Sequence, residues 1–140
     1  MADANVLIAA FLKDSTVRRI VTLAGLQLLV PEYILEEFER HRRALARRAG
    51  LAPRDAEALL ARIRRHFVVV PADLVAGRIA DAMRLLRGID ERDAPYLAAA
   101  LAVPCDATWS DDPHLKRQRA VPCLTTRELV EALRDAGVHL

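Results

Sequence analysis

The most constraining feature of the sequence is an apolar segment that lies between two acidic clusters, within residues 89–115. Residues 96–103 are rich in Ala and Leu and carry no charge, which predicts a helix buried on most sides against a sheet. Pro95 suits the first turn of a helix, so Asp93 is expected at or beside the N-cap, facing the positive end of the helix dipole. A carboxylate therefore marks the start of this predicted helix.

A short strand is predicted directly after that helix, at residues 106–110, and Asp111, Asp112 and Pro113 end it. If the helix and the strand form one α/β unit, the start of the helix and the end of the strand lie at the same edge of the sheet. Asp93 and Asp112 are then expected to share the edge where open parallel sheets bind their ligands.

The rest of the chain alternates between helices and short apolar strands. Further strands are predicted at residues 26–30, 67–70 and 120–124. Because no hairpin turn signal separates these strands, the sequence predicts an α/β fold, a three-layer α/β/α sandwich with a mostly parallel central sheet. The other predicted helices span residues 6–12, 15–25, 32–48, 53–66, 72–87 and 125–136, with Ser15 and Thr126 as N-caps and Gly88 and Gly137 at helix ends.

Length and composition indicate one domain, residues 1–140, which is large enough to bury a sizeable core. No segment approaches the roughly 18 apolar residues of a membrane span, and the N-terminus lacks a signal-peptide pattern, so a cytoplasmic protein without membrane association is expected. Cys105 and Cys123 are too few for a disulfide scaffold or a cysteine zinc site, and we expect both thiols to be reduced.

Basic charge is concentrated in residues 40–66, which hold nine arginines against two acidic residues, a local charge of +7 in a chain whose net charge is +2. Arginine forks match phosphate geometry well, so the region predicts nucleic-acid binding, with Arg42, Arg43 and Arg47 as substrate-binding candidates. A solvated helix face explains the same charges about equally well.

A third acidic candidate comes from the predicted helix at residues 32–48. Successive helix residues advance by about 100°, which points Glu36 away from the apolar side and places Glu37 at its border, where it can reach a cleft. With Asp3 near the start of the chain, four elements then supply carboxylates. Such a set, without His or Cys, suits Mg²⁺ or Mn²⁺.

Four blocks of sequence resemble PIN-domain proteins, a family of metal-dependent ribonucleases that includes the VapC-like toxins of toxin–antitoxin systems. The blocks are DANVLIAAFL, PEYILEEFERHR, DAPYLAAAL and TWSDDPHL, in order over nearly the whole chain. The resemblance implies cleavage of single-stranded RNA with Mg²⁺ or Mn²⁺, and a cognate antitoxin and a homodimer as partners. It implies catalytic roles for Asp3, Glu37, Asp93 and Asp112, metal binding by Asp3, Asp93 and Asp112, and supporting hydrogen bonds from Asn5 and Ser110.

A second metal site and one alternative function remain to be considered. His114 stands where some relatives carry a further acid, so a second metal site would need Asp111 or Asp90 in its place. The alternative function is a catalytically inactive PIN-like module that binds RNA or another protein. A phospho-acceptor signalling domain would need a lysine at the end of the last strand, where Leu124 and Thr125 stand.

The position of Asp3 carries one more expectation. Only Met1 and Ala2 precede it, whereas strands are typically about five or six residues long. If Asp3 ends a buried central strand, the natural start is expected several residues upstream, after a Val/Ile-rich segment.

Overall fold

Parallel strands form the centre of the fold in this computed structural model, which describes residues 1–12, 15–23 and 25–140. Strand β1 (Leu28–Pro31) pairs with β2 (Phe67–Val70), and β3 (Thr108–Trp109) pairs with β4 (Cys123–Leu124). Both pairs are parallel, with Leu28 opposite Phe67 and Thr108 opposite Cys123. The predicted α/β fold with parallel strands is confirmed.

The first residues of the chain join the two strand pairs. The backbone N–H of Ala2 donates to the Leu29 carbonyl over 2.8 Å, and the Trp109 N–H donates to the Met1 carbonyl over 2.6 Å. Ala2 forms a parallel bridge with Trp109. The strand order is therefore β2, β1, the N-terminal segment, β3 and β4. Asp3 directly follows the N-terminal segment, which is the middle one of the five.

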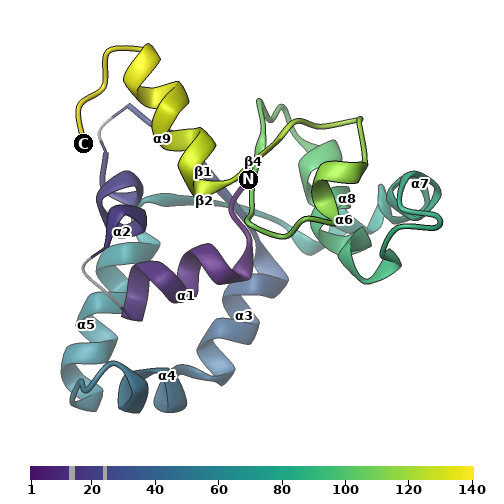
Figure 1. Ribbon diagram of the computed structural model, residues 1–140. Helices are drawn as coiled ribbons and strands as arrows, with labels where there is room; N and C mark the ends of the chain where they lie inside the picture. The colour runs from purple at the N-terminus through teal and green to yellow at the C-terminus, as the bar shows by residue number, and fades with distance from the viewer. Residues whose placement is uncertain (13–14, 24) are drawn as a thin grey trace.

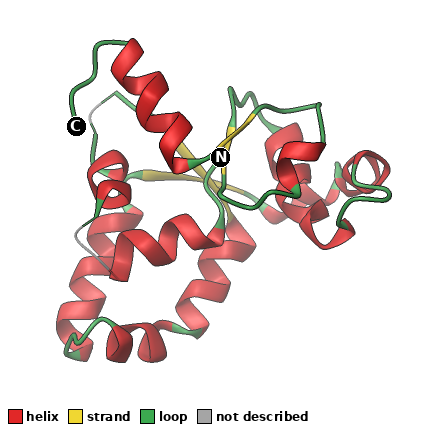
Figure 2. Ribbon diagram, in the orientation of Figure 1, coloured by secondary structure: helices red, strands yellow, loops and turns green. Residues whose placement is uncertain are grey.

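Helices surround the strands, with α1 to α5 below them in the view of Figure 1, α6 to α8 to the right and α9 above. Figure 2 shows how short the strands are beside the helices. The helices are α1 (Ala4–Leu12), α2 (Thr16–Val21), α3 (Glu32–Arg40), α4 (Arg42–Arg48), α5 (Pro53–Arg64), α6 (Ala72–Ala76), α7 (Ile79–Leu85), α8 (Ala94–Ala102), α9 (Thr126–Asp135) and the 3₁₀ turns η1 (Glu91–Asp93) and η2 (Leu115–Arg117).

Two long predicted helices are each broken into two. The helix predicted at residues 32–48 is interrupted at His41, whose φ of −99° and ψ of 6° lie outside the helical region. The helix predicted at residues 72–87 is interrupted at Gly77 and Arg78. Arg78 donates from Nη1 to the Leu101 carbonyl at the end of α8, over 2.9 Å, so this break is held by a contact distant in sequence.

Other predicted boundaries need smaller corrections. The cap of α9 is Thr125 rather than Thr126, because the Thr125 hydroxyl accepts from the Glu128 N–H and the Glu128 carboxylate accepts from the Thr125 N–H. Ser15 has N-cap geometry, but its buried hydroxyl has no partner among the described residues. Helix α2 ends at Val21, and the part of the predicted helix at Ala24 lies outside the described residues.

The core lies between the helices and the strands. Leu97, Ala98 and Ala99 in α8 have no exposed surface, which confirms the prediction of a helix buried on most sides. Phe11 and Phe38 pack edge to face, with ring centroids 5.4 Å apart. Both cysteines are free, as predicted. None of the described helices is long and apolar enough to cross a membrane.

Candidate active site

One pocket, of about 230 Å³, is lined by all four of the predicted carboxylates. Four elements supply them: Asp3 follows the N-terminal segment, Asp112 follows β3, Glu37 lies on α3, and Asp93 precedes α8. All of these lie at or near the carboxyl ends of parallel strands, the edge that the sequence predicted. We call this hollow the acid pocket. Its remaining lining residues are Ala4, Asn5, Tyr33, Ile34, Tyr96, Ser110 and Leu115.

Asp3 links the sheet to the first helix. Its Oδ1 accepts from the Val6 N–H over 2.9 Å, which satisfies one free donor in the first turn of α1 and explains why this helix begins at Ala4. Burial raises the pKa of the Asp3 carboxyl, and this effect outweighs the hydrogen bonds from Ser110 and Val6, which lower it. Burial therefore makes the ionised form of Asp3 less favourable than that of a solvated carboxyl.

Asp93 occupies the N-cap position of α8, as predicted, but its side chain makes no capping hydrogen bond. Its Oδ2 is buried and has no hydrogen-bond partner within the described part of the chain. Burial raises the pKa of this carboxyl, and repulsion from Asp112 and Asp90 raises it further. Because buried polar atoms are nearly always hydrogen-bonded, this oxygen indicates a missing donor or cation.

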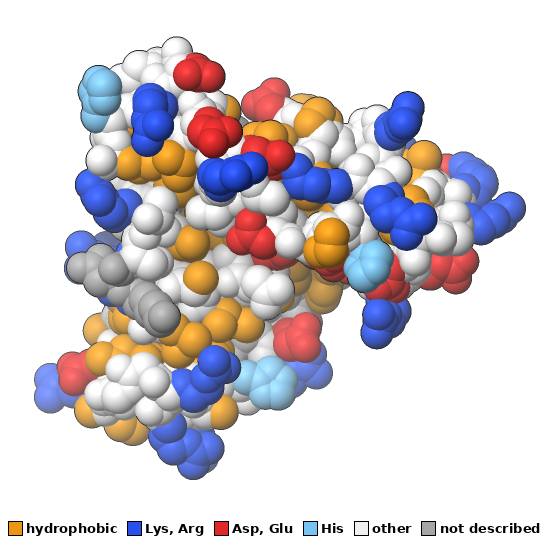
Figure 3. Space-filling view, viewed as in Figure 1, with side chains coloured by type: hydrophobic (Ala, Val, Ile, Leu, Met, Phe, Trp, Pro, Cys, Tyr) orange, Lys and Arg blue, Asp and Glu red, His pale blue; other side chains and the backbone are white. Residues whose placement is uncertain are grey.

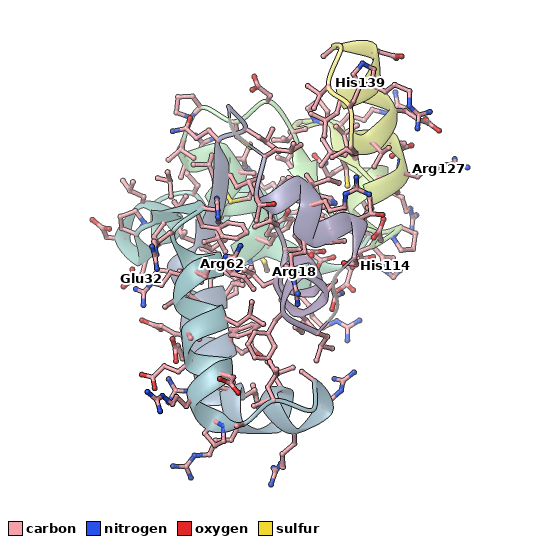
Figure 4. The ribbon with its side chains drawn as sticks, turned by 90° about the vertical axis from the view of Figure 1, so that its left-hand side faces the viewer. Arg18, Glu32, Arg62, His114, Arg127 and His139 are labelled. Carbon is pink, nitrogen blue, oxygen red and sulfur yellow. The ribbon has the colours of Figure 1, made fainter. Side chains whose placement is uncertain are left out.

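Asp112 is held at the end of β3 by its neighbours. Its N–H donates to the hydroxyl of Ser110, a side chain with no exposed surface, over 3.1 Å. Its Oδ1 accepts from the His114 N–H over 2.9 Å and lies 3.0 Å from His114 Nδ1. Figure 4 labels His114, which is exposed and does not line the pocket. The position where some relatives carry an acid therefore contacts Asp112 from outside the pocket.

Glu37 lines the acid pocket, whereas Glu36 does not, in agreement with the helical geometry. Tyr33 lies one turn before Glu37 on α3 and also lines the pocket, which the sequence reasoning missed. The spacing of four residues places both side chains on one helix face and could have revealed it. Burial raises the pKa of the Tyr33 hydroxyl, and the charges of Asp93, Glu37 and Asp3 raise it further. The hydroxyl stays protonated among the acids.

The structure keeps several other predicted residues out of the acid pocket. Asp90 pairs with Arg92 over 2.9 Å, and Asp111 accepts hydrogen bonds from Thr126, so neither takes the place of a further acid. The three predicted substrate-binding arginines line a separate hollow of about 350 Å³ between α4 and α5. These are Arg42, Arg43 and Arg47.

The acid pocket suits a hydrated divalent ion better than a closed protein cage. Within the described residues, no three Asp, Glu, His or Cys side chains lie close enough together to hold a metal ion by themselves. The donors are nevertheless all oxygens, and Asp93 offers a buried oxygen without a partner. Mg²⁺ usually keeps several waters and binds through one or two carboxylates and substrate phosphate. The residues present fit that mode of binding.

The fold and the pocket define an α/β domain with an acidic site at the carboxyl edge of its parallel strands. A family model of the PIN domain matches residues 1–134, so the chain belongs to the PIN-domain family. PIN domains are generally nucleases and typically use divalent metal ions. No curated protein and no solved structure matched the chain.

Proposed function

We propose that this protein is an endoribonuclease that hydrolyses phosphodiesters of single-stranded RNA with Mg²⁺ or Mn²⁺. The observation that carries the proposal is the acid pocket, where carboxylates from four separate elements line one hollow and Asp93 keeps a buried oxygen without a partner. Like charges placed together in this way destabilise the free protein, so a cationic ligand accounts for their arrangement.

In this proposal Asp3, Asp93 and Asp112 would hold a hydrated ion, one or two of them directly and the rest through its waters, and Glu37 at the pocket border would orient the attacking water. When bound, the ion supplies a water of lowered pKa and positive charge beside the phosphate. The Ser110 hydroxyl positions Asp112 by accepting a hydrogen bond from the Asp112 backbone N–H. Asn5 is exposed in the first turn of α1, where its side-chain amide can donate to a phosphate oxygen.

The proposal is tested with end-labelled single-stranded RNA and purified protein. We expect cleavage with Mn²⁺ or Mg²⁺, none in EDTA, and none with the variant that combines D3N, D93N and D112N but still melts cooperatively. Full activity in EDTA, or in the triple variant, contradicts the proposal. Tight RNA binding without cleavage under every metal condition supports the alternative, an inactive PIN-like module that binds RNA or protein.

We also propose that the α4 arginines that line the hollow between α4 and α5 contact the RNA backbone beyond the acid pocket. Replacing Arg42, Arg43 and Arg47 by Ala should weaken RNA binding at low salt. Each lost phosphate contact should flatten the slope of log K against log salt by about 0.7. Binding isotherms at four salt concentrations measure this slope. An unchanged slope assigns the three arginines to a solvated helix face.

We further propose that the nuclease is the toxin of a toxin–antitoxin pair. The acid pocket attracts cations, so a partner protein could block it with a Lys or Arg side chain in place of the metal ion. Co-expression with the product of the adjacent gene should abolish cleavage and rescue growth. Harmless overproduction of active enzyme without any partner favours a role in RNA processing instead.

A further inference from the structure

A second hollow opens beside the acid pocket, between α1, α3 and α4. It has a volume of about 300 Å³ and shares Ala4, Ile34 and Glu37 with the acid pocket, so the two are continuous. We call it the side groove. Figure 3 shows hydrophobic side chains gathered in a band between α1 and α4.

The side groove is apolar along its length and charged at its ends. Its floor includes the buried side chains of Phe38 and Leu45, and Ala44 lies exposed on one wall. Glu37 stands at the border with the acid pocket, and Arg48 is the cationic residue that α4 contributes to the lining. His41 also lines the groove, and a mostly apolar slot with a few polar groups is typical of small-molecule sites.

We propose that the side groove takes one nucleobase of the RNA strand, next to the phosphate that occupies the acid pocket. This inference rests on the proposed function. In a nucleotide the base lies close to its own phosphate. A base in the side groove would likewise lie close to a phosphate in the acid pocket, because the two hollows share lining residues. Apolar walls accept the faces of an unstacked base, while His41 and Arg48 can hydrogen-bond its edge. The volume of about 300 Å³ lies at the lower end of the range of small-ligand pockets, which suits a group of the size of a nucleobase.

The test combines an altered RNA with an altered protein. One abasic nucleotide is placed in turn at each position of a single-stranded RNA, and A44L narrows the groove. The matched control is A61L, an exposed alanine on α5 outside the lining. With wild type and with A61L, we expect one abasic position beside the cut to lower kcat/KM about tenfold. With A44L, intact RNA should be cleaved about tenfold more slowly, and the abasic position should add no further loss.

Equal abasic penalties in wild type and A44L overturn the proposal, as does the lack of any sensitive position. If A44L leaves RNA cleavage unchanged but prevents binding of a partner protein, the groove is a protein site and the proposal is wrong. If no RNA is cleaved at all, the proposed function fails on its own. The same three proteins and the same RNAs are then compared by Kd with fluorescein-labelled RNA, where loss of the abasic penalty in A44L still supports the base site and an unchanged penalty overturns it.

Discussion

Asp111 and Asp112 are adjacent in sequence, yet the structure gives them opposite surroundings. Asp111 accepts from the Thr126 N–H over 2.9 Å and from the Thr126 hydroxyl over 3.0 Å, which holds the start of α9 against the end of β3. Asp112 faces the acid pocket, where its charge raises the pKa of Asp93. One carboxylate completes a helix cap, and its neighbour adds to a cluster of like charges.

The same contrast holds between the regions around them. At the start of α9, Glu128 accepts hydrogen bonds from Thr125 and from Lys116, which lower its pKa to about 2. In the acid pocket, burial raises the pKa of Asp3 and Asp93. Charges that the fold satisfies stabilise it, and the charges that it leaves unsatisfied are those for which we propose a cationic ligand.

The largest expected effect is a difference in RNA cleavage between variants of the two adjacent aspartates, Asp111 and Asp112. D112A should lower kcat/KM for RNA cleavage at least about a hundredfold, because the metal loses a ligand, while D111A should stay within about twofold of wild type. Cleavage of one labelled RNA under saturating Mn²⁺ measures both. Thermal melts serve as the control, since D111A should be the less stable of the two. Comparable losses of activity in both variants would remove the functional distinction between these residues.

A smaller effect, on folding stability, is expected at the start of α9, where the charged side chains have hydrogen-bond partners. T125A should reduce the free energy of unfolding by about 1 kcal/mol, the usual cost of losing an N-cap side chain, without changing the metal dependence of cleavage. Arg127, labelled on α9 in Figure 4, is largely exposed and gives the matched control R127A, which should unfold like wild type. Urea denaturation with an unchanged m-value measures the difference. Equal stability of T125A and wild type would show that the capping box does not stabilise α9.

Features of the fold that depend on neighbouring residues could be predicted from the sequence, whereas features that depend on distant contacts could not. The order of parallel strands and helices follows from the apolar segments and from the Pro, Gly and Asp residues that end them. Gly88 and Gly137 adopt the positive φ expected after a helix. The T-x-x-E pattern of Thr125 to Glu128 is that of a capping box and indicates the correct cap, one residue before the predicted Thr126. These features depend on neighbours in sequence, so a pattern of residues can reveal them.

The breaks at His41 and Arg78 could not be predicted in this way. No proline causes either break. The break at Arg78 is stabilised by a hydrogen bond from its side chain to the Leu101 carbonyl, 23 positions away. In the candidate site, strand ends and a helix start placed Asp93 and Asp112 correctly at one edge. The missing hydrogen-bond partner of Asp93 depends on packing from several elements, which no local pattern records.

The smallest expected effect is on the pH dependence of folding stability. The contribution of Asp93 in the acid pocket should have the opposite sign to that of Glu128, a carboxylate with hydrogen-bond partners. Because the pKa of Asp93 is raised in the folded protein, the folded state binds this proton more tightly than the unfolded state does. The carboxyl therefore adds stability as pH falls through its raised pKa and lowers stability as pH rises above it. Glu128, with a lowered pKa, stabilises the fold above its unfolded value and loses this contribution as pH falls toward about 2.

Removing the charge of Asp93 should therefore stabilise the metal-free protein while it abolishes cleavage. In EDTA at pH 7 we expect D93N to melt about 2 °C above wild type, since it removes a buried charge and its repulsion from Asp112. The difference should shrink as the pH falls and Asp93 in the wild type takes up its proton. Adding Mn²⁺ should raise the Tm of wild type but leave D93N nearly unchanged, because only the wild type retains the full set of ligands. A D93N protein that melts below wild type at every pH would mean that Asp93 stabilises the fold as a helix cap, and the contrast with the start of α9 would then fail at the residue that best supports it.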